Sequence, residues 1–274
     1  MSEKLVDIAI FLISILSRAV IVLTLIYLVL PVFIIVPVSF TSGDLMILPT
    51  PGWSIRWYET LISNPLWSSA FINSLIVGLS STVLATIIGT LSALGLSRMK
   101  SRIKALIMAL VISPMIIPVV ITAVAMFISF SALGLTGSYL GLVLGHTVIA
   151  VPFVVVTVAA TLQVFDWRLT QAAASLGASP SRAFRHVIMP LIMPGIASGA
   201  IFAFATSFDD IILALFIGNP AQRTLPREIF SGIRENTTPA IAAAAIVMIA
   251  LSVLLMISME ALRARSVRLT VTQK

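Results

Sequence analysis

The sequence contains no cysteine and only two histidines among its 274 residues. Without cysteine it can form no disulfide framework, zinc ribbon, iron–sulfur cluster or thiol nucleophile, and two histidines cannot make a histidine-rich metal site. Charged residues are also scarce, at 10% of the chain, whereas soluble domains carry about 25%. Hydrophobic residues make up 59%, and the mean hydropathy is +1.14. These values exclude an ordinary soluble enzyme, a disordered chain and a coiled coil, and they favour a protein surrounded by membrane lipid.

Long apolar stretches fill most of the chain. Each is long enough to cross about 30 Å of hydrocarbon as a helix, and only helices satisfy every backbone polar group of a single segment in lipid. The sequence therefore predicts an all-α polytopic membrane protein with six transmembrane helices. The six stretches are 19–40, 70–96, 105–133, 138–163, 194–218 and 239–262.

The same pattern predicts an N-terminal segment over 1–18, a transmembrane domain over 19–262 and a tail over 263–274. The stretch Lys4–Arg18 is compatible with a short interfacial helix or with an extension of the first span. With both termini in the cytoplasm, thirteen of the seventeen Lys and Arg residues fall on the cytoplasmic side. This bias indicates that orientation, and it accounts for the positive charge without a nucleic-acid partner.

The loop over 164–193 contains the sequence signals of two short helices. A run of alanines favours a short helix over 165–176, which Gly177 would end in a left-handed conformation. Ser179 suits an N-cap and Pro180 a first helical position, so a second short helix is expected there. We expect Pro190 and Pro194 to stop that second helix before the fifth span.

The residues of this loop resemble the EAA motif of permease subunits in binding-protein-dependent ABC importers. The segment from Gln171 to Gly177 reads Q-A-A-A-S-L-G, and V-I-M-P follows, ending at Pro190. Gln171 stands where the motif usually has an acidic residue. The resemblance implies that the loop is a coupling helix that docks on a cytoplasmic ATPase. The implied coupling residues are Gln171, Ala172, Ala173, Gly177, Ala178, Ser179, Pro180, Arg182 and Pro190.

This resemblance also implies the type I, MetI-like fold, a multi-pass location in the bacterial inner membrane, and several partners. These are a cytoplasmic ABC ATPase dimer, a second homologous permease subunit, a periplasmic substrate-binding protein and membrane lipid. The chain has no G-x-x-x-x-G-K-[ST] phosphate loop, so ATP and Mg²⁺ are expected on the ATPase subunits and no cofactor on this chain. No catalytic residue and no metal site are expected here.

The segment 202–216 and the sequence from Thr224 to Pro226 look like the polyamine subgroup, which includes spermidine and putrescine permeases. Asp209 and Asp210 are the only acidic residues deep in a predicted span. A carboxylate there costs at least about 2.5–3.5 kcal/mol, which makes both residues, with Phe208 beside them, candidates for the substrate path. The alternative role is structural, such as capping a broken helix. Opines, γ-aminobutyrate and aminoalkylphosphonates are the alternative substrates.

Two other classes of protein fit less well. An ion-driven secondary transporter would need inverted repeats and ionisable groups in several spans. An intramembrane enzyme would need a nucleophile and a base at one depth. His146 could relay protons, but a packing role is favoured. Small residues at four-residue intervals, as at Gly195 and Gly199, predict close helix packing.

Overall fold

The computed structural model describes residues 3–99, 101–235 and 237–271, and this part of the chain is almost entirely helical. An isolated bridge between Thr41 and Trp53 is the one β-type pairing among these residues. The elements are α1 (Glu3–Ser39), α2 (Arg56–Ser63), α3 (Pro65–Arg98), α4 (Ile103–Ile116), α5 (Val119–Ala132), α6 (Tyr139–Gln163), α7 (Arg168–Ser175), α8 (Pro180–Ala183), η1 (Phe184–Ile188), α9 (Met189–Phe208), α10 (Ile212–Ile217), η2 (Pro220–Gln222), α11 (Leu225–Glu235) and α12 (Ala240–Val271).

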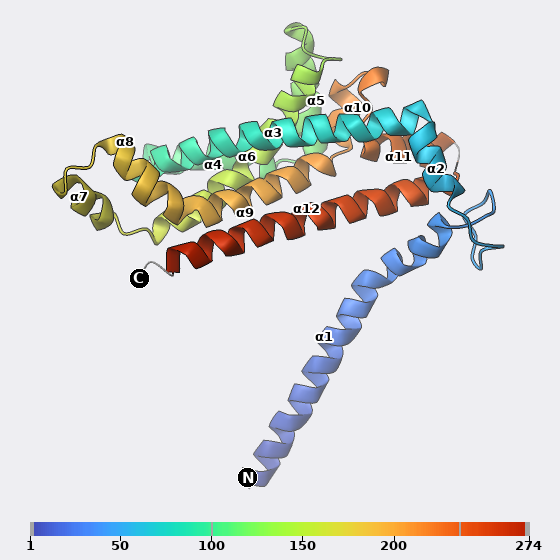
Figure 1. Cartoon of the computed structure of the whole chain (residues 1–274), viewed down its shortest axis with the longest axis horizontal. Coiled ribbons are helices and arrows are strands. Elements are labelled where there is room, and N and C mark those ends of the chain that lie inside the picture. Colours follow the sequence, from blue (N-terminus) through green and yellow to red (C-terminus); the bar gives the residue numbers. More distant parts are fainter. Residues whose placement is uncertain (1–2, 100, 236, 272–274) are drawn as a thin grey trace.

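Three long helices, α3, α6 and α9, form the centre of the molecule, and α12 runs beside α9 (Figure 1). Small residues allow α6 and α9 to approach closely, as the four-residue spacing predicted. A Cβ atom added to Gly199 would lie 2.6 Å from the Thr157 hydroxyl oxygen and 2.9 Å from the Cα of Val154. Gly195 faces Thr161 in the same way. Buried alanine, valine, leucine and isoleucine side chains fill the remaining space between these helices.

The first helix leaves this bundle. α1 is a continuous helix from Glu3 to Ser39, so Lys4–Arg18 extends the first span rather than forming a separate helix. Its membrane-length part, Ile10–Ser39, has no buried residue in its most apolar window, and it contacts α12 only toward one end (Figure 1). Most apolar side chains of α1 between Ile10 and Ile34 are therefore available to lipid or to another protein.

Two of the predicted spans are broken. The third stretch consists of α4 and α5, which meet at 105° around Ile117 and Pro118. Proline disfavours helical ψ in the residue before it, and Ile117 accordingly has ψ 133°. The fifth stretch ends as α9 at Phe208 and resumes as the short α10 at Ile212. Within the described residues, five helices are long and apolar enough to span a membrane, or six if α4 and α5 count as one span.

The prediction that Pro190 and Pro194 separate the loop from the fifth span was wrong. The chain stays helical from Pro180 to Phe208. It does so through η1, a turn of π-helix in which the Met189 N–H donates to the Phe184 carbonyl. The wider π turn precedes Pro190, where a normal α-helix would place the proline ring against a carbonyl of the preceding turn.

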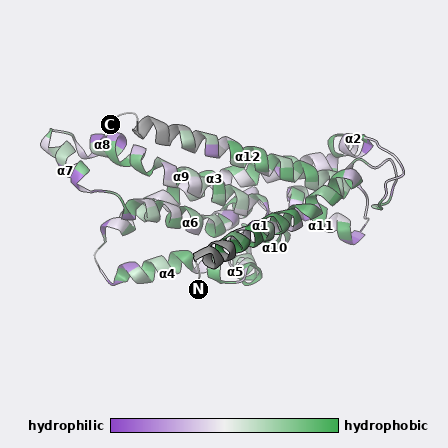
Figure 2. Ribbon diagram, turned by 90° about the horizontal axis from the view of Figure 1, so that it is seen from below, coloured by the Kyte–Doolittle hydropathy of each residue, from purple (hydrophilic) through white to green (hydrophobic). Residues whose placement is uncertain are grey.

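The hydrophilic loops gather at the two ends of the molecule (Figure 2). One end holds α7, α8, the start of α4 and the described end of α12, while α2 and α11 lie at the other end (Figures 1 and 2). The loops that carry most of the basic residues thus share one end of the molecule, and the side of the membrane that this end faces stays a prediction.

Candidate coupling loop and transport path

The loop over 164–193 begins with a helix that is shorter than predicted. α7 starts at Arg168 rather than at Phe165. Just before it, the Asp166 carboxylate accepts the Arg168 N–H at 2.9 Å, and the rings of Phe165 and Trp167 meet edge to face with centroids 4.8 Å apart.

Gly177 ends α7 as its position in the sequence predicts. Its φ is +81°, in the left-handed region. The Ala178 N–H donates to the Ala173 carbonyl at 3.0 Å and the Gly177 N–H to the Ala174 carbonyl at 2.9 Å. This pair of bonds is a Schellman motif, which satisfies the last carbonyls of α7 and reverses the chain direction. The elbow between the two short helices is therefore fixed by backbone geometry.

Ser179 and Pro180 start the second helix as predicted. Ser179 is the extended N-cap residue of α8, with ψ 157°, and Pro180 occupies the first helical position. The structure places most of the implied coupling residues on the surface: Gln171, Ala172, Gly177, Ser179, Pro180, Arg182 and Pro190 are exposed, and Ala173 and Ala178 are half-buried.

Apolar side chains also stand on the surface of this loop. Leu176, the C-cap residue of α7, is 89% exposed, and Leu169 on the same helix is 46% exposed. α7 lies at one end of the molecule, beyond the ends of the long helices (Figure 1). Its exposed leucines lie outside the apolar stretches predicted to cross the membrane, which makes this loop a candidate for a protein contact.

Trp167 attaches the loop to the bundle. The guanidinium of Arg98, at the end of α3, lies 5.4 Å from the centre of the Trp167 ring. Phe165 and Phe184, at the two sides of the loop, pack with Trp167 against the main core. A displacement of α7 and α8 would consequently be passed to α3 and α9. The motif did not indicate this residue, although an aromatic pair at the start of the predicted helix is a usable signal.

At the other sequence-predicted site, the structure separates the two aspartates. Asp210 accepts the Leu213 N–H at 2.7 Å with its carboxylate, and so caps the N-terminal end of α10. Asp209 is the first residue of the break, its side chain is exposed, and its carboxylate has no hydrogen bond or ion pair among the described residues. The two carboxylates thus differ in role: one is committed to the backbone, and the other is available to a ligand.

Phe208 does not share the exposed position of Asp209. It is 3% exposed and stacks on Phe204 with ring centroids 5.1 Å apart, against α3. Phe202, at 52% exposure, and Phe216, at 37%, are the aromatic residues of the segment 202–216 that reach the surface.

A buried polar chain links the three central helices near the break. His146 on α6 is fully buried, and its Nδ1 lies 3.0 Å from the Ser207 hydroxyl and 3.1 Å from the Ser207 carbonyl on α9. The Ser207 hydroxyl also lies 2.9 Å from that of Ser81 on α3. His146 is therefore hydrogen-bonded inside the helix packing, as favoured from the sequence, to a residue in the last turn of α9.

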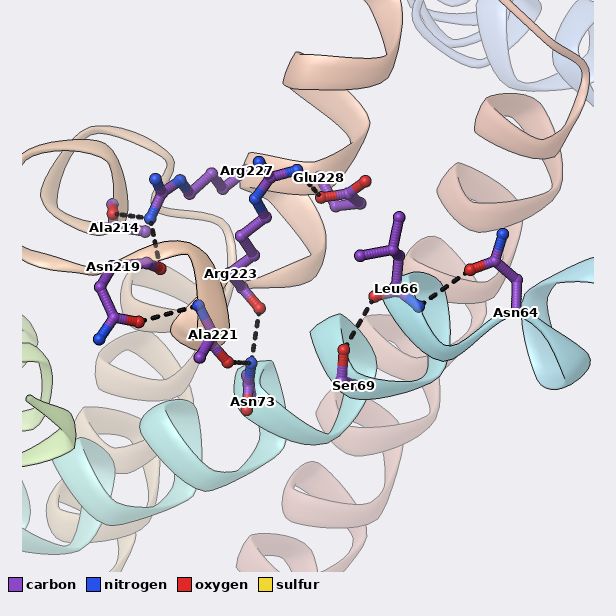
Figure 3. Close-up of polar contacts among 10 residues, drawn as sticks. All are labelled: Asn64, Leu66, Ser69, Asn73, Ala214, Asn219, Ala221, Arg223, Arg227 and Glu228. Atoms are coloured by element: carbon purple, nitrogen blue, oxygen red, sulfur yellow. Dashed lines mark hydrogen bonds and ion pairs between the residues drawn. The ribbon is translucent and has the colours of Figure 1, made fainter. Parts of the chain in front are cut away.

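A second polar cluster holds the segment between α10 and α11 against the start of α3 (Figure 3). The Asn73 side-chain amide donates to the carbonyls of Ala221 and Arg223, at 3.1 and 2.9 Å, and accepts the Tyr139 hydroxyl at 2.6 Å. The Ser74 hydroxyl accepts the Leu225 N–H at 2.7 Å. Sequence reasoning missed these residues because their partners lie far away in the chain.

Two arginines of this cluster have different partners. Arg223 pairs with the largely buried Glu228, with a nitrogen–oxygen distance of 3.1 Å. The guanidinium of Arg227 donates instead to two carbonyls, those of Ala214 and Asn219 (Figure 3). Burial lowers the pKa of Arg227, and the nearby charge of Arg223 lowers it further, while Glu228 opposes both effects. Arginine remains charged through such shifts.

Together, the bundle of apolar helices, the capped surface loop and the interrupted span define a component of a membrane transport system. A family model described as the inner membrane component of binding-protein-dependent transport systems matches residues 85–268. The chain belongs to this family.

Two individual relatives and one solved structure are also similar to this chain. The chain is 32% identical over 231 residues to the spermidine/putrescine transport system permease protein PotC of Haemophilus influenzae, covering 84% of this chain and 90% of that protein. It is 30% identical to the putrescine transport system permease protein PotI of Escherichia coli K12, covering 80% of each chain. A chain of a bacterial alginate ABC transporter, solved in complex with an alginate-bound periplasmic protein, has the same fold, with a TM-score of 0.71, 16% identity, and coverage of 93% of this chain and 94% of that one.

Proposed function

We propose that this chain forms half of the translocation path of an ATP-driven importer for polyamines such as putrescine and spermidine. In this proposal, a periplasmic binding protein delivers the substrate and a cytoplasmic ATPase dimer supplies the energy. The observation that carries the proposal is the two-helix loop, which presents exposed leucines on a backbone fixed by caps. Membership of the family and the names of the relatives support the class and the substrate, respectively.

The loop is suited to transmit force. The Schellman motif at Gly177 and the proline at the start of α8 restrict the elbow, and Trp167 connects α7 to α3 and to the core. A rigid element that docks in a groove moves the helices to which it is attached. We place ATP and Mg²⁺ on the ATPase subunits, and we assign no bond-making step to this chain.

A second permease subunit would complete the pathway. The described part of the chain has five or six candidate spans. Most of α1 diverges from the others and contacts α12 only toward one end (Figure 1), and its most apolar window has no buried residue. We infer that a homologous subunit packs against this helix and against the open side of the bundle, with membrane lipid around both. Both termini would then face the cytoplasm, together with α7 and α8.

Asp209 is the residue that we assign to the substrate. Polyamines carry several ammonium groups, and a carboxylate without a protein partner at a helix break can attract one of them. Asp210 already bonds to the backbone of α10, so we assign it the structural role. Phe202 on the exposed side of α9 offers an aromatic face for a cation. A related amino compound, such as an opine, γ-aminobutyrate or an aminoalkylphosphonate, remains the second candidate class of substrate.

The test is ATP-dependent uptake of labelled putrescine and spermidine into vesicles that contain this subunit with its co-purified partners. Asp209→Asn and Asp210→Asn form a matched pair, since each removes one charge at adjacent positions. An asparagine oxygen can still accept the Leu213 N–H, so Asp210→Asn should keep most of the uptake, whereas Asp209→Asn should lose most of it with ATP hydrolysis retained. An assembly that hydrolyses ATP but takes up neither polyamine would exclude this substrate class and leave the importer class in place. Uptake driven by an ion gradient without ATP would instead identify a secondary transporter.

A further inference from the structure

α10 is too short to be stable as a helix on its own. It has six residues, and an isolated helix of that length is unstable in the absence of tertiary contacts. A charged side chain forms a hydrogen bond with a backbone group at each end of α10. The Asp210 carboxylate accepts the Leu213 N–H at 2.7 Å, and the Arg227 guanidinium donates to the Ala214 carbonyl at 2.8 Å. The signs of both charges complement the helix dipole, with the anion at the N-terminal end and the cation at the C-terminal end.

Arg227 also bonds to the chain that leaves α10. The same nitrogen, Nη1, donates to the Asn219 carbonyl at 3.2 Å. It would lie 3.1 Å from a Cβ at Gly218, so the absence of a side chain there leaves room for the guanidinium. One cation therefore donates to two carbonyls, each of which also accepts a main-chain N–H: Gly218 donates to Ala214 and Gln222 to Asn219 (Figure 3).

The helix that carries Arg227 is itself fixed. Leu225, the first residue of α11, donates its N–H to Ser74 of α3, and the segment just before it accepts two bonds from Asn73. On its other side, α10 is held through the turn between α5 and α6, where the Gly137 N–H donates to the Ile217 carbonyl at 2.7 Å. Arg227 is thus the side chain through which the platform formed by α3 and α11 bonds to α10.

We propose that Arg227 is a positioning residue for transport: it holds α10 in place and thereby fixes the break at which Asp209 is exposed. Without the guanidinium, the Ala214 and Asn219 carbonyls keep only their main-chain donors, and α10 loses the charged side chain that joins its C-terminal end to α11. The three residues between α9 and α10 then gain freedom, and the Asp209 carboxylate no longer occupies one position. The part of this inference that concerns Asp209 rests on the proposed function.

The chain's lack of cysteine makes a direct test possible, since two introduced cysteines are the only labelling sites in it. Spin labels at Phe216→Cys on α10 and Ile233→Cys on α11, both surface positions, report the distance between the helices in the assembled transporter. Three substitutions are compared in this background: Arg227→Gln, Arg227→Lys, and Arg234→Gln as the matched control. Arg234 is an exposed arginine of the same helix, stacked on Phe230.

We expect the distance distribution to broaden in Arg227→Gln, with polyamine uptake reduced at least tenfold and ATP hydrolysis retained. Lysine keeps the charge and one donor, so Arg227→Lys should fall between the wild type and Arg227→Gln in both readouts. Arg234→Gln should resemble the wild type. A variant that fails to fold would lose ATP hydrolysis as well as uptake, so retained ATP hydrolysis distinguishes loss of positioning from misfolding.

An unchanged distance distribution in Arg227→Gln would overturn the inference, and so would a broadened distribution with uptake within twofold of the wild type. If the wild-type assembly transports neither polyamine, the proposed substrate fails on its own. The distance distributions then still decide whether Arg227 holds α10.

Discussion

Replacing Gly177 with alanine tests the coupling loop with little other disturbance. No atom lies within 4 Å of the position that the new Cβ would occupy, so the substitution creates no clash. The substitution instead makes the native backbone conformation less favourable, because φ at this position is +81° and a residue with a Cβ in the left-handed region costs about 1–2 kcal/mol of free energy. A cost of this size shifts an equilibrium about 5- to 30-fold. The fraction of permease whose loop has the elbow described above should fall accordingly.

The assay is the affinity of the ATPase for the permease assembly in lipid nanodiscs, together with ATP-dependent uptake. We expect Gly177→Ala to weaken ATPase binding about 5- to 30-fold. Gly177→Asn should weaken it less, because asparagine tolerates the left-handed region better than alanine does. Gly95→Ala is the matched control: Gly95 lies inside α3 with open space around it, and alanine favours a helix. Unchanged binding in Gly177→Ala would refute the claim that the elbow is needed for docking.

Three further substitutions test the packing that supports the site. Gly199→Ala places a Cβ against the backbone of α6 and should destabilise the protein by about 1–3 kcal/mol; a thermal unfolding midpoint equal to that of the wild type would contradict this. His146→Leu removes the hydrogen bonds to Ser207 inside the core and should lower the free energy of unfolding by about 1–3 kcal/mol, measured by the same thermal unfolding assay. A variant more stable than the wild type would show that these bonds are not favourable. Trp167→Ala removes the contact with Arg98, which is worth about 0.5–1 kcal/mol at an exposed site. We expect it to lower the amount of substrate taken up per ATP hydrolysed. An unchanged ratio of uptake to ATP hydrolysis would show that the loop transmits motion by another route.

The caps of the coupling loop could be predicted because they depend on local chemistry. Gly177, Ser179 and Pro180 each suit one backbone conformation, and the structure places each in that conformation. The break at Pro118 uses the same kind of signal, since proline restricts the residue before it. It was missed because hydropathy is continuous from residue 105 to residue 133.

Other features depend on contacts that no local pattern encodes. Pro190 reads as a helix stop, but the π turn before it keeps the helix intact. The amide of Asn73 and the guanidinium of Arg227 find main-chain carbonyls that only the folded chain brings near. The different roles of Asp209 and Asp210 likewise follow from where α10 begins, which the sequence pattern left open.

The central claim, that this chain docks an ATPase through its loop, can be tested by photocrosslinking in native membranes. A photoreactive amino acid replaces Leu176 on the loop or, as the control, Ile62 at the opposite end of the molecule; these side chains are 89% and 81% exposed. We expect the probe at position 176 to capture a chain with an ATP-binding phosphate loop, identified by mass spectrometry, and the probe at position 62 to capture none. Failure to capture an ATPase from position 176, or equal capture from both positions, would contradict the account.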